Sequence, residues 1–235
     1  VTIKLETLGA YSDTAPYNCP KSRRILRKGV KALYESNDPG KFSLGILCLL
    51  AADDPSDPDN TKYQARAKEW AHLLIAPSAE EVRPSPWMAG YHLIVLSEYY
   101  MKTKDKAVFP TLTFYAEHFA KGQSWFGTTG HRYCEMQPDG SGNGRIAGYG
   151  PISASGVAGF FGLVMAREAG VKSPRVDAAI KRADIFFGHY AYKGGLNYGE
   201  MPYAIGGRPG DNNGKHATAA FAFGLQAGGE KKAKW

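Results

Sequence analysis

Two kinds of helical stretch alternate along this chain, and this alternation constrains the fold more than any motif does. The stretch 153–169 is apolar on every side, since it carries no charge before Arg167. The stretch 174–190 is apolar on one side only, through Val176, Ala179, Ile180, Ala183, Phe186 and Phe187. A helix that is apolar all round is buried all round, whereas a one-sided helix lies on a core. The sequence therefore predicts inner helices enclosed by outer ones.

The alternation recurs along the chain and predicts pairs of outer and inner helices. The expected outer helices are 22–35, 61–75, 106–120 and 174–190, and the expected inner ones are 42–52, 86–101, 153–169 and 215–227. Apolar and polar residues alternate at 1–8, which indicates a strand. One strand alone is not stable, so we expect it to belong to a sheet upstream. The predicted fold class is all-α, with an α/α toroid, partial or complete, over 10–235 after a terminal strand at 1–9.

Composition limits the classes of protein to which the chain can belong. Its 235 residues suffice for one sizeable core, and the sequence lacks the run of about 18 apolar residues that predicts a membrane-spanning helix. The formal net charge is +7, but the aromatic residues follow the core periodicity instead of lying among the basic residues. Nucleic acid is therefore not an expected partner. The sequence has no basic-then-apolar leader, as in a mature or trimmed product, and we expect an extracytoplasmic or periplasmic location.

Three cysteines do not fix the redox compartment. Cys48 falls in an apolar helix, where we expect a small buried side chain. Cys19 and Cys134 fall in predicted loops and either pair or stay free.

The connections from outer to inner helices carry the functional argument. They span 76–86, 121–152 and 191–214, and the last two are rich in glycine and aromatic residues. In a ring these connections gather at one end, beside the partly positive N-termini of the inner helices. Loops longer than about 12–15 residues are usually functional or disordered. Large aromatic residues argue against disorder here: Trp125, Tyr133, Tyr149, Tyr192, Tyr198 and Tyr203.

The long loops supply residues that suit an acidic glycan. Four carboxylates are candidate catalytic acids and bases: Glu135, Asp139, Glu200 and Asp211. Aromatic, basic and imidazole side chains are candidate substrate-binding residues: Trp125, His131, Arg132, Tyr149, Tyr198, Lys215 and His216. Tyr149 or Tyr198 beside a basic group would serve a lyase. In the alternative interpretation the glycines make turns and the charged groups cap helices and tie loops together.

No metal or other cofactor is predicted. Residues 139–144 read Asp-Gly-Ser-Gly-Asn-Gly like the start of a calcium loop, but the twelfth position is Gly150 instead of Glu, which leaves only a looser calcium site open. His131 and Cys134 would make half a zinc site without a second pair. The acidic turn at 53–59 is expected to be a solvated turn at the opposite end from the long loops.

Several segments carry a resemblance to a known family. They are Leu8-Gly-Ala-Tyr-Ser-Asp-Thr-Ala-Pro-Tyr-Asn-Cys-Pro-Lys-Ser, Trp87-Met-Ala-Gly-Tyr, Gly122-Gln-Ser, Gly148-Tyr-Gly, Ala166-Arg-Glu-Ala-Gly-Val and Asp211-Asn-Asn-Gly-Lys. Through them the chain resembles an uncharacterised bacterial family in which a PDZ-like domain precedes an α/α toroid of the terpenoid cyclase and protein prenyltransferase superfamily. The resemblance implies that 1–8 is the last strand of the PDZ-like domain and that the toroid continues beyond this chain. It implies no activity.

Two functions remain after this comparison. The chain lacks the deep Asp runs of terpenoid cyclases, the zinc set of prenyltransferases and the Cys-Gly-Glu-Gln run of thioester proteins. The favoured hypothesis is a binding or scaffold module that recognises an acidic glycan or a protein. The alternative is a carbohydrate-active enzyme, a hydrolase or lyase on an acidic polysaccharide, with two titratable loop groups roughly 5–10 Å apart.

Overall fold

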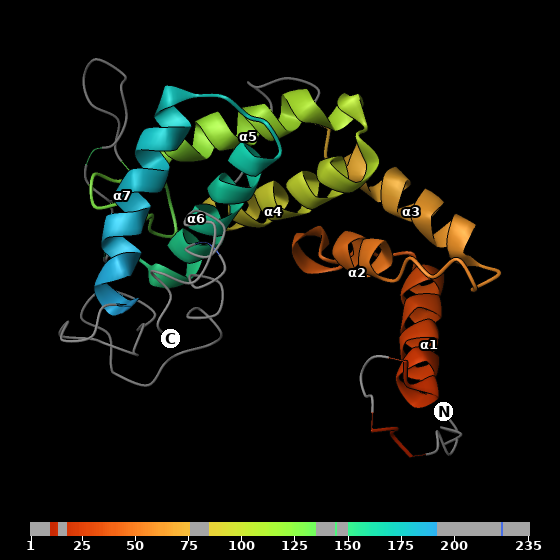
Figure 1. The fold of residues 1–235 in the computed structure, drawn as a ribbon. Helices are drawn as coiled ribbons and strands as arrows, with labels where there is room; N and C mark the ends of the chain where they lie inside the picture. Colours follow the sequence, from red (N-terminus) through yellow and green to blue (C-terminus); the bar gives the residue numbers. More distant parts are fainter. Residues whose placement is uncertain are drawn as a thin grey trace. The chain divides into compact units, whose positions relative to one another are not determined.

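The computed structural model is all-helical over the residues that it describes, which are 10–13, 18–75, 85–134, 144, 150–191 and 222. Its elements (Figure 1) are α1 (Pro20–Ser36), η1 (Lys41–Ser43), α2 (Gly45–Ala51), α3 (Asn60–Leu73), α4 (Pro86–Thr103), η2 (Lys106–Val108), α5 (Phe109–Gly122), α6 (Ser153–Glu168) and α7 (Pro174–Ala191). In these ranges the β-structure is limited to a bridge between Thr129 and Ile152. The all-α prediction is confirmed. The strand at 1–8 lies outside the described residues, and the ring arrangement stays a prediction.

The hydrophobic periodicity located six helices closely. The predicted stretches 22–35, 61–75, 86–101, 106–120, 153–169 and 174–190 correspond to α1, α3, α4, η2 with α5, α6 and α7. The stretch 42–52 is not one helix, because Phe42 has φ 59° and Ser43 also has φ 59°, in the left-handed region that an α-helix cannot include. Of the predicted helix 215–227, only Ala222 is described, and it is helical and buried.

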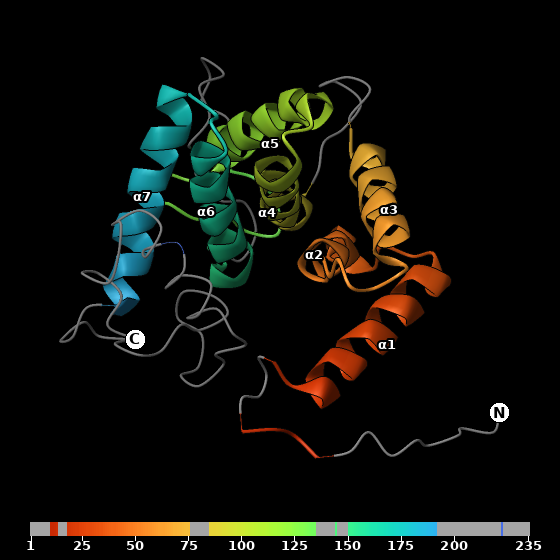
Figure 2. The same cartoon turned by 45° about the vertical axis from the view of Figure 1, so that its right-hand side comes forward.

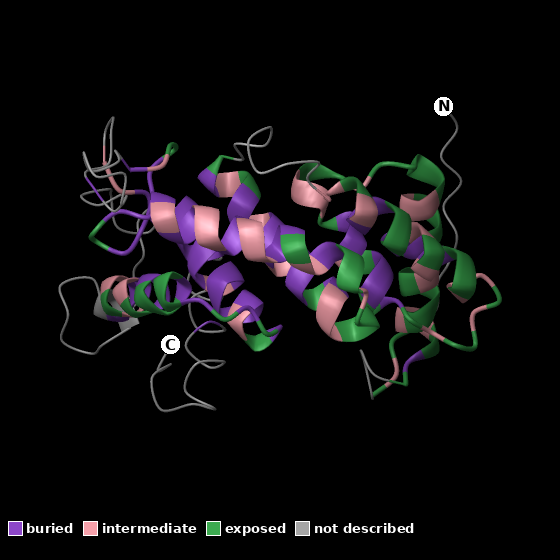
Figure 3. Ribbon diagram, turned by 90° about the horizontal axis from the view of Figure 1, so that it is seen from above, coloured by how far each residue is buried: buried purple, intermediate pink, exposed green. Residues whose placement is uncertain are grey.

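The chain divides into two compact units, Val1–Trp70 and Ala71–Trp235. In the second unit α4 packs most extensively on α6, and buried residues (purple in Figure 3) run along both helices. Glycines allow this close approach. A Cβ on Gly90 would lie 2.8 Å from the backbone nitrogen of Gly159, and one on Gly162 would lie 2.6 Å from the Leu93 Cβ. The two helices that are apolar on nearly every side are therefore packed backbone to backbone.

Helices α5 and α7 are amphipathic, as predicted. The apolar face of α7 is buried through Val176, Ala179, Ile180, Ala183 and Phe187. Phe187 stacks on Phe160 of α6 with 5.6 Å between ring centroids. On the other face Ile185 is 68% exposed. α7 thus covers α6 with one side and meets solvent with the other.

The first unit is built differently (Figure 2, red to orange). α1 buries only Val30. Its Arg27 guanidinium binds the acidic turn after α2, with Nη2 2.8 Å from the Asp54 Oδ2 and Nε 3.4 Å from the Asp57 Oδ2. The turn predicted to be merely solvated therefore holds α1 by ion pairs. Cys48 is exposed, which corrects the expectation of a buried thiol, since it lies on the side of the short α2 that is not covered.

Candidate binding surface

The loop after α5 is a tight, hydrogen-bonded turn. α5 ends at Gly122 because Gln123 adopts an extended backbone, with φ −69° and ψ 139°. The Ser124 backbone N–H and hydroxyl both donate to the Thr128 carbonyl, at 2.9 and 2.7 Å. Gly127 has φ +100° and donates its N–H to the Ser124 carbonyl at 3.0 Å. This left-handed conformation favours glycine, so the sequence itself specifies the turn.

The Gln123 side chain fixes the base of this loop to α7. Its amide Nε2 donates to the carbonyls of Gly127 at 3.0 Å and Ala179 at 3.2 Å, and its Oε1 accepts from the Arg182 Nε at 3.0 Å. Gln123 is 1% exposed, so these bonds satisfy an amide that would otherwise be buried without partners. The loop, in green, can be followed beside α7 in Figure 1.

A second set of buried bonds fixes the loop to the start of α6. The Thr128 hydroxyl donates to the Ile152 carbonyl at 2.9 Å, and the Ile152 N–H donates to the Thr129 carbonyl at 2.8 Å. The Ser155 hydroxyl lies 3.1 Å from the Thr129 hydroxyl and donates to the Gly130 carbonyl at 3.1 Å. The base of the loop is therefore held by α6 as well as by α7.

Above this buried base, two turns expose large side chains. Trp125 is 61% exposed and Phe126 is 42% exposed, and their rings stack with centroids 3.8 Å apart. Further along, His131 and Arg132 are exposed. The indole Nε1 of Trp87, in the first turn of α4, donates to the His131 Nδ1 at 3.2 Å. His131 is thus oriented by α4.

The side chains beneath the loop form a buried aromatic layer. The Tyr133 ring packs edge-on against His118, with 4.8 Å between centroids. Its hydroxyl is buried, and burial raises the pKa of Tyr133 above its ordinary value. His92 of α4 packs against Tyr115 of α5 at 5.4 Å, and burial lowers the pKa of His92 to about 4. Tyr133, expected among the loop aromatics, is half-buried, and its ring packs inwards against His118 and Phe119.

The structure places three of the predicted site residues on one loop: Trp125, His131 and Arg132. The others lie outside the described residues and stay predictions: Glu135, Asp139, Tyr149, Tyr198, Glu200, Asp211, Lys215 and His216.

The described part of the chain shows no group of three or more His, Cys, Asp or Glu side chains arranged to hold a metal. The proposed zinc half-site is used otherwise, since the Cys134 thiol donates to the Gln123 carbonyl at 3.3 Å. Cys134 and Cys19 are both free thiols.

Sequence reasoning missed three residues of this region: Trp87, Gln123 and Arg182. Trp87 follows Pro86 at a helix start and was assigned to an apolar inner helix. Gln123 stands directly after an amphipathic helix, where a polar residue is unremarkable. Arg182 lies on the charged face of α7, yet its Nη2 is buried and has no hydrogen-bond partner among the described residues, and burial lowers the pKa of this guanidinium.

Fold and surface together define an all-α domain that displays aromatic and basic side chains on a hydrogen-bonded loop. The chain belongs to the family DUF6288, a domain of unknown function, whose sequence pattern matches residues 22–235. No curated protein and no solved structure matches the chain at a significant level. No helix among the described residues is long and apolar enough to cross a membrane. The expected uncharacterised family is thereby confirmed, whereas the PDZ-like and toroid assignments stay predictions.

Proposed function

We propose that this domain is a binding module that recognises an acidic glycan through the loop after α5. The observation that carries the proposal is the stacked Trp125–Phe126 pair, exposed at the tip of a loop whose base is buried and hydrogen-bonded. Apolar side chains of this size are normally covered, so a held, exposed aromatic pair favours a recognition surface. The C–H face of a sugar ring packs well on such a platform.

Basic and imidazole groups on the same loop favour an acidic glycan over a neutral one. Arg132 is exposed, and its side chain has a planar fork of donors that matches a carboxylate or a sulfate. His131 is exposed beside Arg132, and Trp87 orients its imidazole ring. Both turns lie on one preformed loop, so little conformational entropy is lost on binding.

An inferred ring architecture is consistent with the same proposal. We infer an α/α toroid because α4 and α6, the expected inner helices, are buried along most of their length, while α5 and α7 are one-sided. In such a ring the loops that precede inner helices share one end, where a glycan chain would lie.

The test is binding of the full chain to neutral, uronic and sulfated polysaccharides, measured by calorimetry. We expect Trp125→Ala to weaken binding of an acidic polysaccharide at least about tenfold, as for a central aromatic anchor. Arg132→Gln should reduce the preference for acidic over neutral chains. The matched control is Ile185→Ala, an exposed apolar residue of α7, which should bind as the wild type does. Equal binding by the Trp125→Ala and wild-type proteins would refute the proposal.

The enzyme alternative is examined in the same samples by measuring chain length and unsaturated products. A hydrolase or lyase would shorten the polysaccharide, and the Asp211→Ala variant would stop this reaction. Binding without products would support the binding module. Products formed by the wild type but not by the Asp211→Ala variant would establish the enzyme.

A further inference from the structure

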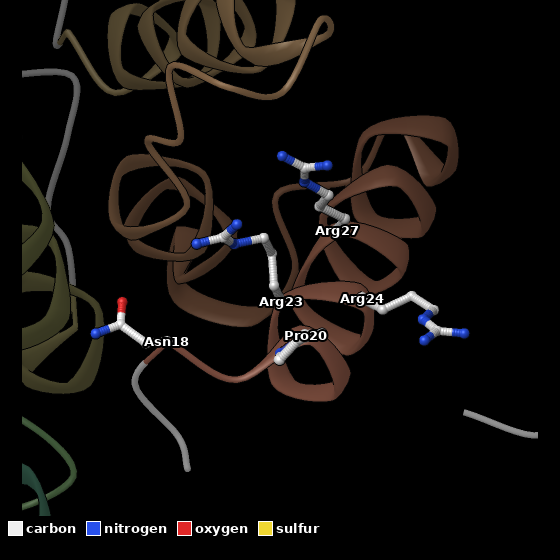
Figure 4. A pocket seen from close by; sticks show the side chains of 5 residues that line it. All are labelled: Asn18, Pro20, Arg23, Arg24 and Arg27. Carbon is white, nitrogen blue, oxygen red and sulfur yellow. The ribbon is translucent and has the colours of Figure 1, made fainter. Parts of the chain in front are cut away.

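A cavity of about 340 Å³ lies at the start of α1, in the first unit, and is lined by arginines. Its lining residues are Asn18, Pro20, Arg23, Arg24 and Arg27. Figure 4 shows that the guanidinium groups of Arg23 and Arg27 project from one side of α1, whereas that of Arg24 extends from the other. This cavity belongs to neither the proposed glycan surface nor the unit that carries it.

The charges around this cavity are not balanced. Within the described residues, Arg23 and Arg24 make no ion pair or hydrogen bond through their side chains, and no carboxylate lines the cavity. Arg27 uses Nε and Nη2 on Asp54, Asp57 and Ser56, which leaves its Nη1 without a partner among the described residues.

A neighbouring cavity of about 440 Å³ provides a contrast. It shares Asn18 and Arg23 with the first but is also lined by Asp53 and Asp54, whose carboxylates supply the opposite charge. Of these two cavities, the first is therefore the one whose lining favours an anion.

We propose that the cavity lined by Arg23 and Arg27 binds a tetrahedral oxyanion, the phosphate or sulfate group of a small ligand. The guanidinium of Arg23 supplies a fork of donors that pairs with no described residue, and the Nη1 of Arg27, which also has no partner among the described residues, adds another donor. The first turn of the 17-residue α1 adds partial positive charge, since it contains no acidic residue and its N-cap makes no side-chain bond.

Inorganic phosphate and sulfate are the probes for this site, titrated into the full chain by calorimetry against sodium chloride at equal ionic strength. We expect saturable binding, with amide NMR shifts in the first turn of α1. Arg23→Gln should weaken binding at least about tenfold, since a charge-assisted pair contributes about 1.5–3 kcal/mol. Arg23 has no partner in the described structure, so its loss should leave folding unchanged.

The control is Lys28→Gln, which removes one positive charge from the same helix without touching either cavity lining. It should change affinity by less than about twofold at this ionic strength. Tighter binding of phosphate than sulfate would assign a phosphorylated ligand, and the reverse a sulfated one. No saturable binding beyond chloride, or equal losses in the two variants, would overturn the proposal.

Discussion

The helices α4 and α6 and the helix α1 are held by different interactions, although their lengths are similar. α6 buries twelve of its residues, and glycines bring its backbone against that of α4. α1 buries one residue and depends on Arg27 and its two carboxylate partners. Close packing is little affected by salt but does not accommodate a larger side chain. Exposed ion pairs weaken in salt but tolerate a change of side-chain volume. The stability of the second unit should thus fall when a buried side chain is enlarged, and the stability of the first unit should fall when salt is added.

The largest difference in stability between the two units is expected when a helical glycine is replaced by valine in each of them. Gly90→Val places a side chain against the α6 backbone, 2.8 Å from the Gly159 nitrogen for the Cβ alone. It should lower the free energy of unfolding by more than about 3 kcal/mol, above the usual range for overpacking, since backbone cannot move aside.

Gly29→Val in α1 is the matched control, because nothing lies within 4 Å of a Cβ there. It should change the free energy of unfolding by less than about 0.5 kcal/mol, because glycine and valine have similar, low helix propensities. Urea denaturation measures both variants. Similar losses would show that α1 is packed as tightly as α4.

Acid should weaken the second unit through His92. Burial lowers the pKa of His92 to about 4, from an ordinary 6.5, so the unfolded chain binds the proton more readily. This part of the stability is fully present above pH 6.5 and is lost as the pH falls towards 4, by about 3 kcal/mol. His92→Phe, which keeps an aromatic ring against Tyr115, should remove this slope. The midpoints of urea denaturation of both proteins at pH 7 and pH 4.5 test this prediction. The same change of midpoint with pH in the two proteins would contradict it.

The first unit should weaken in a lower pH window and with salt. Hydrogen bonds from Ser56 and Arg27 hold the pKa of Asp54 at about 2, below its ordinary 3.8. The stability from this carboxylate is present above pH 3.8 and is lost as the pH falls through about 2. Arg27→Gln should lower the melting temperature modestly, and 1 M NaCl should shrink the difference from the wild type. Arg24→Gln, which removes an arginine that forms no ion pair with a described residue, should melt as the wild type does. If salt leaves the melting-temperature difference between Arg27→Gln and the wild type unchanged, Arg27 stabilises the unit through packing and not through its ion pairs.

The smallest effect concerns thiol chemistry without a change in stability. Hydrogen bonds from Ser12 and Ser22 lower the pKa of Cys19 to about 6, and the Ser12 N–H lies 3.4 Å from the sulfur. Alkylation of Cys19 by iodoacetamide, followed by mass spectrometry, should rise to a plateau with a midpoint near pH 6. Ser12→Ala should move the midpoint upwards. A midpoint near about 8.5, that of an ordinary thiol, would contradict the prediction.

Hydrophobic periodicity predicted α1 and α3 to α7, because the pattern of apolar residues along a helix depends on local spacing. It failed at Phe42 and Ser43, since left-handed backbone at non-glycine residues leaves no trace in a pattern of polarity. Loop composition identified Trp125, His131 and Arg132 as exposed candidates. It could not identify Gln123, because the bond from Gln123 to Ala179 joins residues 56 positions apart and exists only once α7 is in place. It placed Tyr133 among the loop aromatics but could not show that the ring packs inwards.

In the loop after α5, the residues of the fixed base cannot be substituted freely, whereas the residues of the exposed tip can. Gln123 and Thr128 serve the fold, and a change at either would leave buried polar groups without partners. Trp125 and Phe126 are exposed at the tip, where new side chains would meet only solvent or a ligand. Mutations at those two positions can therefore accumulate without loss of the domain. Duplicated copies would be free to acquire new ligands there while one inherited scaffold is kept.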